Sequence, residues 1–141
     1  MRYKTTIATV LVVATMTLCV KPTMAEAPIG NYINWDIIPI PKIIEKIAPQ
    51  FGQDPSLIKN VVFMESSYNC NSIHDGGKGK GCTGFHKDTF IGYEKIYFKK
   101  YHEHLNYDSN LDQLKLMSFV FSLSERERHL WTSYTKIQKM L

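Results

Sequence analysis

The chain has 141 residues, with 17 Lys and Arg, 13 Asp and Glu and a formal net charge of +4. Three of the basic residues and none of the acidic ones lie in the first 25 residues, so the remaining 116 residues carry 14 basic and 13 acidic side chains. This near-neutral segment with mixed signs lacks the basic stretch expected of a nucleic-acid-binding protein. Its 116 residues, without an internal repeat, are enough for one domain with one core.

The first 25 residues have the pattern of a secretory signal peptide. Arg2 and Lys4 make the start positive, "TIATVLVVATMTLCV" is a mostly apolar stretch, and "TMA" ends in the small residue Ala25. A membrane anchor is one alternative, but the stretch is short for a bilayer and contains four threonines. A lipoprotein is another, although the small residue that normally precedes a lipidated cysteine is absent. We predict cleavage after Ala25, a lead-in over 26–38 and a periplasmic or secreted domain over 39–141.

Two helices are the next predicted elements. Over 39–47 the isoleucines recur at i, i+3, i+4 and i+7, which is the spacing of one helix face. "FGQDP" then supplies a stop at Gly52, an N-cap at Asp54 and a proline at the first position of the second helix. That helix runs through apolar residues to Glu65 and ends at "SSYN", where a loop over 69–87 begins.

Two cysteines enclose the glycine-rich part of this loop. Cys19 leaves with the predicted signal, so Cys70 and Cys82 remain as an even pair, for which a disulfide is the default in an exported protein. The alternative is a zinc site, because Cys70, His74, Cys82 and His86 form two C-x3-H pairs. Zinc pairs usually use shorter cysteine spacings, and oxidation competes for the thiolates. We predict the disulfide and no metal or other cofactor.

Three further helices complete the predicted domain. Asp88 or Thr89 would cap the first of them, which carries a stripe of large side chains at helical spacing: Phe90, Tyr93, Ile96, Tyr97 and Tyr101. The second begins near Ser109, and the third covers the last residues from about Glu125. The stripe is expected to pack in the core, the alternative being a platform for stacking sugar rings. Strand-like alternation is missing, so we predict a compact all-α domain with a disulfide-tethered glycine-rich loop.

The segment "FGQDPSLIKNVVFMESSYNCNSI" resembles the first motif of the lysozyme-like lytic transglycosylases. In that family a "G-x-(D/N)-P-x-L-(I/L)" helix start leads through apolar residues to "E-S-x-(F/Y)-N", which Glu65, Ser66, Tyr68 and Asn69 match in place. The resemblance extends over about 39–93. It implies a lysozyme-like helical fold and cleavage of the glycosidic bond between N-acetylmuramic acid and N-acetylglucosamine in peptidoglycan.

The second family motif, roughly "G-x-x-G-(L/M)-M-Q", is similar to "GCTGFHK" in this chain. Both glycines match, whereas Phe85, His86 and Lys87 replace the aliphatic residue, the methionine and the glutamine. The third motif, typically "A-Y-N-x-G", is not visible, and Tyr134 in "TSYTK" is a positional candidate for it. The resemblance therefore implies the following substrate-binding residues: Ser66, Gly84, Phe85, His86, Lys87 and Tyr134.

Glu65 is the predicted catalytic residue. A carboxyl group among apolar neighbours can hold a proton near neutral pH, and the expected walls are the preceding residues Val61, Val62, Phe63 and Met64. The resemblance implies that the same glutamate then acts as base, so that the 6-hydroxyl of the N-acetylmuramoyl unit closes an anhydro ring. Ordinary glycosidases pair two carboxylates. Asp75 and Asp88 are the nearest acids, but we predict a turn and a helix cap for them and assign neither to catalysis.

These features predict a peptidoglycan lytic transglycosylase that opens the cell wall locally for an envelope-spanning secretion or conjugation apparatus. Small single-domain relatives are often associated with such machines, so the predicted partners are glycan strands and proteins of that apparatus. Two alternatives stay open. Lys87 and the missing third motif favour a scaffold that binds glycan strands without cutting them, and a secreted hydrolytic lysozyme is the other.

Overall fold

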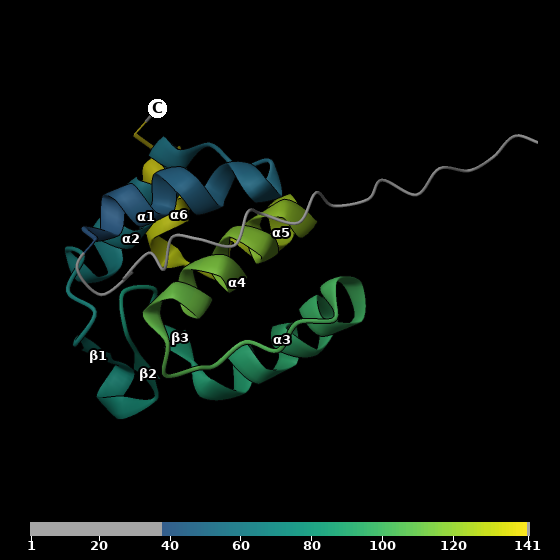
Figure 1. The fold of residues 1–141 in the computed structure, drawn as a ribbon. Helices are drawn as coiled ribbons and strands as arrows, with labels where there is room; N and C mark the ends of the chain where they lie inside the picture. Colours follow the sequence, from purple (N-terminus) through teal and green to yellow (C-terminus); the bar gives the residue numbers. More distant parts are fainter. Residues whose placement is uncertain (1–37, 141) are drawn as a thin grey trace, which may run out of the picture. The chain divides into compact units, whose positions relative to one another are not determined.

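The computed structural model describes residues 38–140, and the predicted signal peptide and most of the predicted lead-in lie outside them. Six α-helices dominate this part of the chain (Figure 1). In chain order the elements are α1 (Ile40–Ile47), the 3-10 helix η2 (Ala48–Phe51), α2 (Pro55–Ser66), β1 (Ile73–His74), the 3-10 helix η3 (Asp75–Gly77), β2 (Gly79–Lys80), β3 (Phe85–His86), α3 (Lys87–Tyr101), α4 (Asn110–Leu123), α5 (Glu125–Arg128) and α6 (Thr132–Gln138). Within 38–140, no helix has both the length and the apolar character needed to cross a bilayer.

Local signals set the bounds of the first two helices, as predicted. Three isoleucines of α1 are buried on one face: Ile43, Ile44 and Ile47. Gly52 has a left-handed φ of 67° and ends η2, a conformation that glycine adopts without strain. The Asp54 carboxylate then accepts a hydrogen bond from the Ser56 N–H at 2.8 Å and caps α2. These features confirm the stop and cap predicted from "FGQDP" and place Glu65 in the last turn of α2.

The core is built around α4, which packs against α1, η2, α3 and α5 (Figure 1). Eight consecutive or near-consecutive residues of α4 are buried: Gln113, Leu114, Leu116, Met117, Ser118, Phe119, Val120 and Phe121. A helix that is buried all round belongs to the centre of a domain rather than to its surface. The Ser109 hydroxyl accepts from the Asp112 N–H at 3.2 Å and caps α4, which confirms the predicted start near Ser109.

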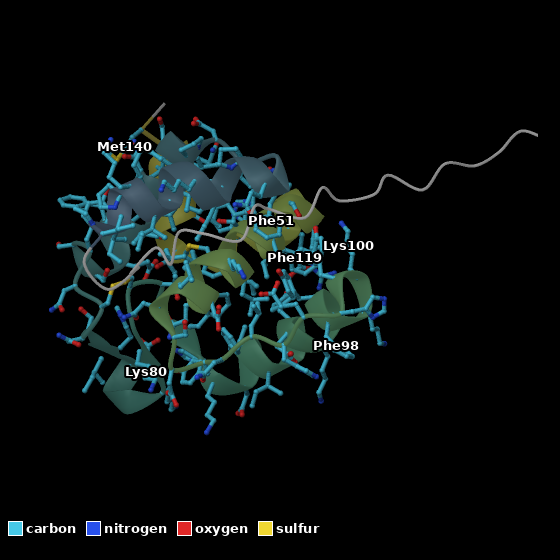
Figure 2. All side chains as sticks on the ribbon, viewed as in Figure 1. Phe51, Lys80, Phe98, Lys100, Phe119 and Met140 are labelled. Carbon is cyan, nitrogen blue, oxygen red and sulfur yellow. A yellow bond between two sulfur atoms is a disulfide. The ribbon has the colours of Figure 1, made fainter. Side chains whose placement is uncertain are left out.

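Part of the predicted aromatic stripe joins this core. Phe90 and Tyr97 are buried on α3, and the ring of Tyr97 meets that of Phe119 edge to face with centroids 5.3 Å apart. Phe51 and Phe119 lie together in Figure 2, with Lys100 beside them. Edge-to-face pairs of this kind add stability beyond the area that they bury. Core packing of the stripe is thus confirmed for Phe90 and Tyr97, and Tyr93 and Tyr101 pack against the same core partly buried, whereas Ile96 is exposed.

The predicted all-α domain is confirmed as a mostly helical one, but the glycine-rich loop also forms a small antiparallel sheet that was not predicted. The strand order is β1-β2-β3, with His74 opposite Gly79 and Gly79 opposite His86. Strands of two residues are too short to show alternation, so the sequence pattern could not reveal them. The helix after the sheet also starts earlier than predicted: α3 begins at Lys87, with His86 and not Asp88 or Thr89 at the N-cap position.

Candidate functional site

A pocket of about 360 Å³ lies where the end of α2, the small sheet and the chain before α6 meet. Its lining comes from five separate parts of the chain: Glu65, His74, Asp75, Gly84, Phe85, His86, Thr89, Leu130, Trp131 and Thr132. This volume is within the usual range of small-ligand sites. Glu65, the predicted catalytic residue, is therefore on the wall of a pocket large enough for a ligand.

The two carboxylate oxygens of Glu65 have different surroundings. The buried Ser133 hydroxyl, in the first turn of α6, donates a hydrogen bond to Glu65 Oε1 at 2.5 Å. The other oxygen, Oε2, faces Gly84: a Cβ added to that glycine would lie 3.4 Å from it. Helices α2 and α6 pack against each other, which brings these residues together although 68 positions separate Glu65 from Ser133.

Glu65 also differs from a structural glutamate in its partners. None of the ion pairs within residues 38–140 includes Glu65. A buried carboxylate kept for stability alone is normally paired with a cation. Glu65 is instead partly buried, held by one neutral hydroxyl and open to the pocket on its other side.

Neighbouring helices hold the backbone of 82–84 in place. The Ser66 hydroxyl donates to the carbonyl of Cys82 at 2.9 Å, and the Trp131 indole N–H donates to the carbonyl of Thr83 at 2.8 Å. Gly84 follows with a left-handed φ of 69°. Since α2 and the chain just before α6 each supply one of these donors, the wall opposite Glu65 is tied to the same elements that carry Glu65 and Ser133.

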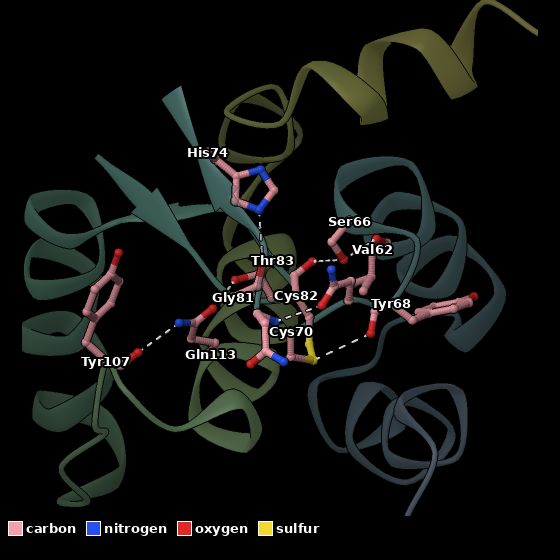
Figure 3. Close-up of a disulfide and its surroundings, with 12 residues drawn as sticks. Val62, Ser66, Tyr68, Cys70, His74, Gly81, Cys82, Thr83, Tyr107 and Gln113 are labelled. Carbon is pink, nitrogen blue, oxygen red and sulfur yellow. Dashed lines mark hydrogen bonds between the residues drawn. A yellow bond between two sulfur atoms is a disulfide. The ribbon is translucent and has the colours of Figure 1, made fainter. Parts of the chain in front are cut away.

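The buried side chain of Gln113, on α4, supports the same wall (Figure 3). Its side-chain amide donates to the carbonyl of Tyr107 at 2.8 Å and accepts from the Thr83 hydroxyl at 2.8 Å. Gly81 passes so close that an added Cβ would lie 2.8 Å from Gln113 Nε2, and its φ is 85°. Only glycine fits this combination of close approach and left-handed backbone. Gln113 therefore fixes where the loop crosses the core.

Cys70 and Cys82 form the predicted disulfide, which Figure 3 shows beside this network. Cys82 is completely buried. Because both sulfurs are used in the bridge, the alternative zinc site of Cys70, His74, Cys82 and His86 is wrong for this structure. Within 38–140, no group of three or more His, Cys, Asp or Glu side chains is arranged to hold a metal ion.

Two histidines of the sheet line the pocket and have separate partners. His74 Nε2 lies 3.1 Å from the carbonyl oxygen of Gly81, and His86 Nε2 lies 2.6 Å from Asp75 Oδ2. Asp75 has a left-handed φ of 50° and lies in the first position of η3, which agrees with the predicted turn. The structure adds that Asp75 lines the same pocket as Glu65.

The predicted substrate-binding residues are only partly brought together. Gly84, Phe85 and His86 line the pocket. Ser66 does not line the pocket, because its hydroxyl donates to the backbone carbonyls of Val62 and Cys82. Lys87 is exposed at the start of α3 and is also outside the pocket lining.

Tyr134 is also outside the pocket, because its ring is buried against Phe121 and its hydroxyl donates to Glu125. Burial, together with the hydrogen bond to Glu125, raises the pKa of Tyr134. The residue that reaches Glu65 is its neighbour Ser133. One position along a helix turns a side chain by about 100°, so a match by position alone could not choose between the two.

The apolar walls expected for Glu65 come from other residues than predicted. Val61 and Val62 are buried in the core, whereas Phe63 and Met64 are exposed, and none of the four lines the pocket. Its apolar lining is instead formed by Phe85, Leu130 and Trp131. No periodicity in "HLWTSYT" indicates that these residues approach Glu65, because the approach depends on how α6 packs against α2.

Comparison of the chain with protein-family models, with curated proteins and with solved structures gave no match in any of the three. The pocket's own residues are therefore the basis for a function.

Proposed function

We propose that this protein is a lysozyme-like peptidoglycan lytic transglycosylase, which cleaves the bond between N-acetylmuramic acid and N-acetylglucosamine with Glu65 as its acid and base. The observation that carries the proposal is the unequal setting of the two Glu65 oxygens. Oε1 accepts from Ser133, so the proton of the neutral carboxyl group belongs on Oε2. Oε2 is the oxygen that faces Gly84 across the pocket.

This setting meets the geometric requirement for a general acid. Such a group must present its proton within hydrogen-bond reach of the leaving oxygen. A glycosidic oxygen seated beside Gly84 would meet Oε2, because a glycine leaves open the place of a side chain there. The ionised Glu65 then takes the proton of the 6-hydroxyl as the anhydro ring closes, and the oxygen of that hydroxyl attacks the anomeric carbon in place of water. Glycan strands are the substrate, and the cell wall is the site of action.

The sequence arguments for export and for a partner apparatus belong to the same proposal. After removal of residues 1–25 the enzyme would act in the periplasm or outside the cell. There it would open the wall for an envelope-spanning secretion or conjugation apparatus, whose proteins would recruit it.

Asp75 favours a second candidate, a hydrolytic lysozyme. Its carboxylate lines the same pocket as Glu65, which supplies the two acids that ordinary glycosidases require. In that case Asp75 activates a water and the products carry reducing ends in place of anhydro rings. The contact of His86 Nε2 with Asp75 Oδ2 would then hold the base in position.

Product analysis tests both candidates. Residues 26–141 are incubated with purified peptidoglycan, and the soluble fragments are identified by mass spectrometry. We expect anhydro-muropeptides from the wild type and none from Glu65→Gln. Hydrated fragments alone would establish the hydrolytic lysozyme. A folded protein that sediments with peptidoglycan but releases no fragments would instead be the scaffold that binds glycan strands without cutting them.

A further inference from the structure

One ring nitrogen of His74 is hydrogen-bonded to the backbone, and the other lies near Gly84 in the pocket. Its Nε2 lies 3.1 Å from the carbonyl oxygen of Gly81 (Figure 3), and a carbonyl only accepts hydrogen bonds. Nε2 therefore carries a hydrogen, so Nδ1 of the neutral ring is an unprotonated acceptor.

Gly84 connects this nitrogen with Glu65. The place of the missing Gly84 side chain is 3.4 Å from Glu65 Oε2 and 3.6 Å from His74 Nδ1. All three residues line the same pocket. Both atoms therefore border the same space in front of Gly84, where a hydroxyl of a bound sugar or a water would contact the carboxyl oxygen on one side and the imidazole nitrogen on the other.

We propose that His74 is a second proton-transfer residue of this pocket, a role that rests on the proposed function of Glu65. Glu65 Oε2 delivers its proton to the leaving glycosidic oxygen while the bond from that oxygen to the anomeric carbon breaks. The attacking hydroxyl, from the 6-position of the sugar or from water, bonds to the same carbon and gives its proton to His74 Nδ1. Transfer of that proton back to the Glu65 carboxylate restores both groups for the next cycle. His74 thus carries the proton from the attacking hydroxyl to Glu65, which remains its final acceptor.

The ionisable groups around His74 are few and have defined partners. Glu65 faces it from α2, and Asp75 follows it in the chain. His86 approaches from β3 across Gly79, where an added Cβ would lie 3.0 Å from His86 Cδ2 and 3.3 Å from His74 Cβ. Asp75 is engaged by His86 Nε2. The remaining lining, from α3 and the chain around the start of α6, carries no ionisable group: Thr89, Leu130, Trp131 and Thr132.

The test separates proton transfer from loop anchoring. In His74→Gln the side-chain amide can still donate to the Gly81 carbonyl, but no basic nitrogen replaces Nδ1. We expect kcat for fragment release to fall at least about a hundredfold, with KM changed less than about threefold, since a positioned base contributes at least that factor. The pH–rate profile should lose one of its two ionisations. His104→Gln is the matched control, because His104 pairs with Glu94 outside the pocket, and it should retain the wild-type rate and profile.

A second variant covers the case in which His74→Gln is poorly folded. Imidazole added to His74→Ala should restore the rate in proportion to its concentration, which a missing structural contact would not produce. Wild-type rate and two ionisations in a folded His74→Gln would overturn the role of His74 alone, while Glu65→Gln still abolished release. Absence of imidazole rescue in a folded His74→Ala would overturn it as well. If the wild type itself released no fragments, the proposed function would fall, and this inference with it.

Discussion

At the scale of single residues, Glu65 combines a neutral partner on one oxygen with an open pocket on the other. Glu65→Gln keeps the shape of the side chain, and its amide oxygen can still accept from Ser133. We expect the free energy of unfolding to change by about 1 kcal/mol or less and fragment release to fall at least about a hundredfold. Chemical denaturation and mass-spectrometric release assays measure the two quantities. A destabilised variant that releases fragments at the wild-type rate would overturn the proposed catalytic role of Glu65.

Ser133 allows a second test at this scale, because in the proposed mechanism its hydrogen bond to Oε1 leaves Oε2 to carry the proton. Ser133→Ala should lower turnover at least about tenfold, since a hydrogen bond to an ionised group is worth about 1.5 to 3 kcal/mol. Ser118→Ala is a matched control: Ser118 is also buried, but its hydroxyl donates to the Leu114 carbonyl within α4. The control should lose stability without losing turnover per folded molecule. Equal losses of turnover in both variants would show that Ser133 has no special role.

At the scale of elements, the glycine-rich loop depends on where its backbone meets α4. Gly81 and Gly76 both have left-handed φ, of 85° and 66°, but only at Gly81 would an added Cβ meet the side chain of Gln113; at Gly76 it would meet nothing within 4 Å. Gly76→Ala should therefore cost about 1 kcal/mol of unfolding free energy from backbone strain. Gly81→Ala should cost about 1 to 3 kcal/mol more, because it also overpacks the buried amide.

Urea denaturation of the two alanine variants gives this difference directly. Gly81→Ala should also release fragments more slowly, because Gly84 and Phe85 of the pocket lining follow it in the chain, whereas Gly76→Ala should not. Equal stabilities of the two variants would mean that the loop can move away from Gln113 at no cost.

At the scale of the whole molecule, the Cys70–Cys82 bridge joins the chain just after α2 to the segment that leads to Gly84 in the pocket wall. Reduction should lower the free energy of unfolding by about 3 kcal/mol, as the chain-entropy model gives for a loop this short. The thermal midpoint should drop, while the helical spectrum below it should persist, because the core around α4 lies outside the bridged loop. Circular dichroism with and without reductant measures this.

The matched control for reduction is the Cys70→Ser, Cys82→Ser double variant. Its midpoint should lie near that of the reduced wild type and should not respond to reductant. After the proposed removal of residues 1–25, the wild type should contain no free thiol, since Cys19 would leave with them. Titratable thiols in the untreated protein would contradict the bridge.

The sequence by itself determined the features that depend on neighbouring residues. The ends of α1 and α2 follow from isoleucine spacing, Gly52 and Asp54, because helix periodicity and capping act within a few positions. The pairing of Cys70 with Cys82 follows from the small number of cysteines. The identity of Glu65 as the candidate acid came from its place in a motif, which is also local.

Tertiary structure alone decided what surrounds Glu65. Ser133 and not Tyr134 reaches its carboxylate because of the angle at which α6 packs on α2, and chain spacing does not specify that angle. His74 and Asp75 enter the pocket because two-residue strands pair across the loop, a contact without any periodic signal. The apolar walls come from Phe85 and Trp131 for the same reason: packing joins residues that are far apart in the chain, whereas sequence patterns report only those that are close.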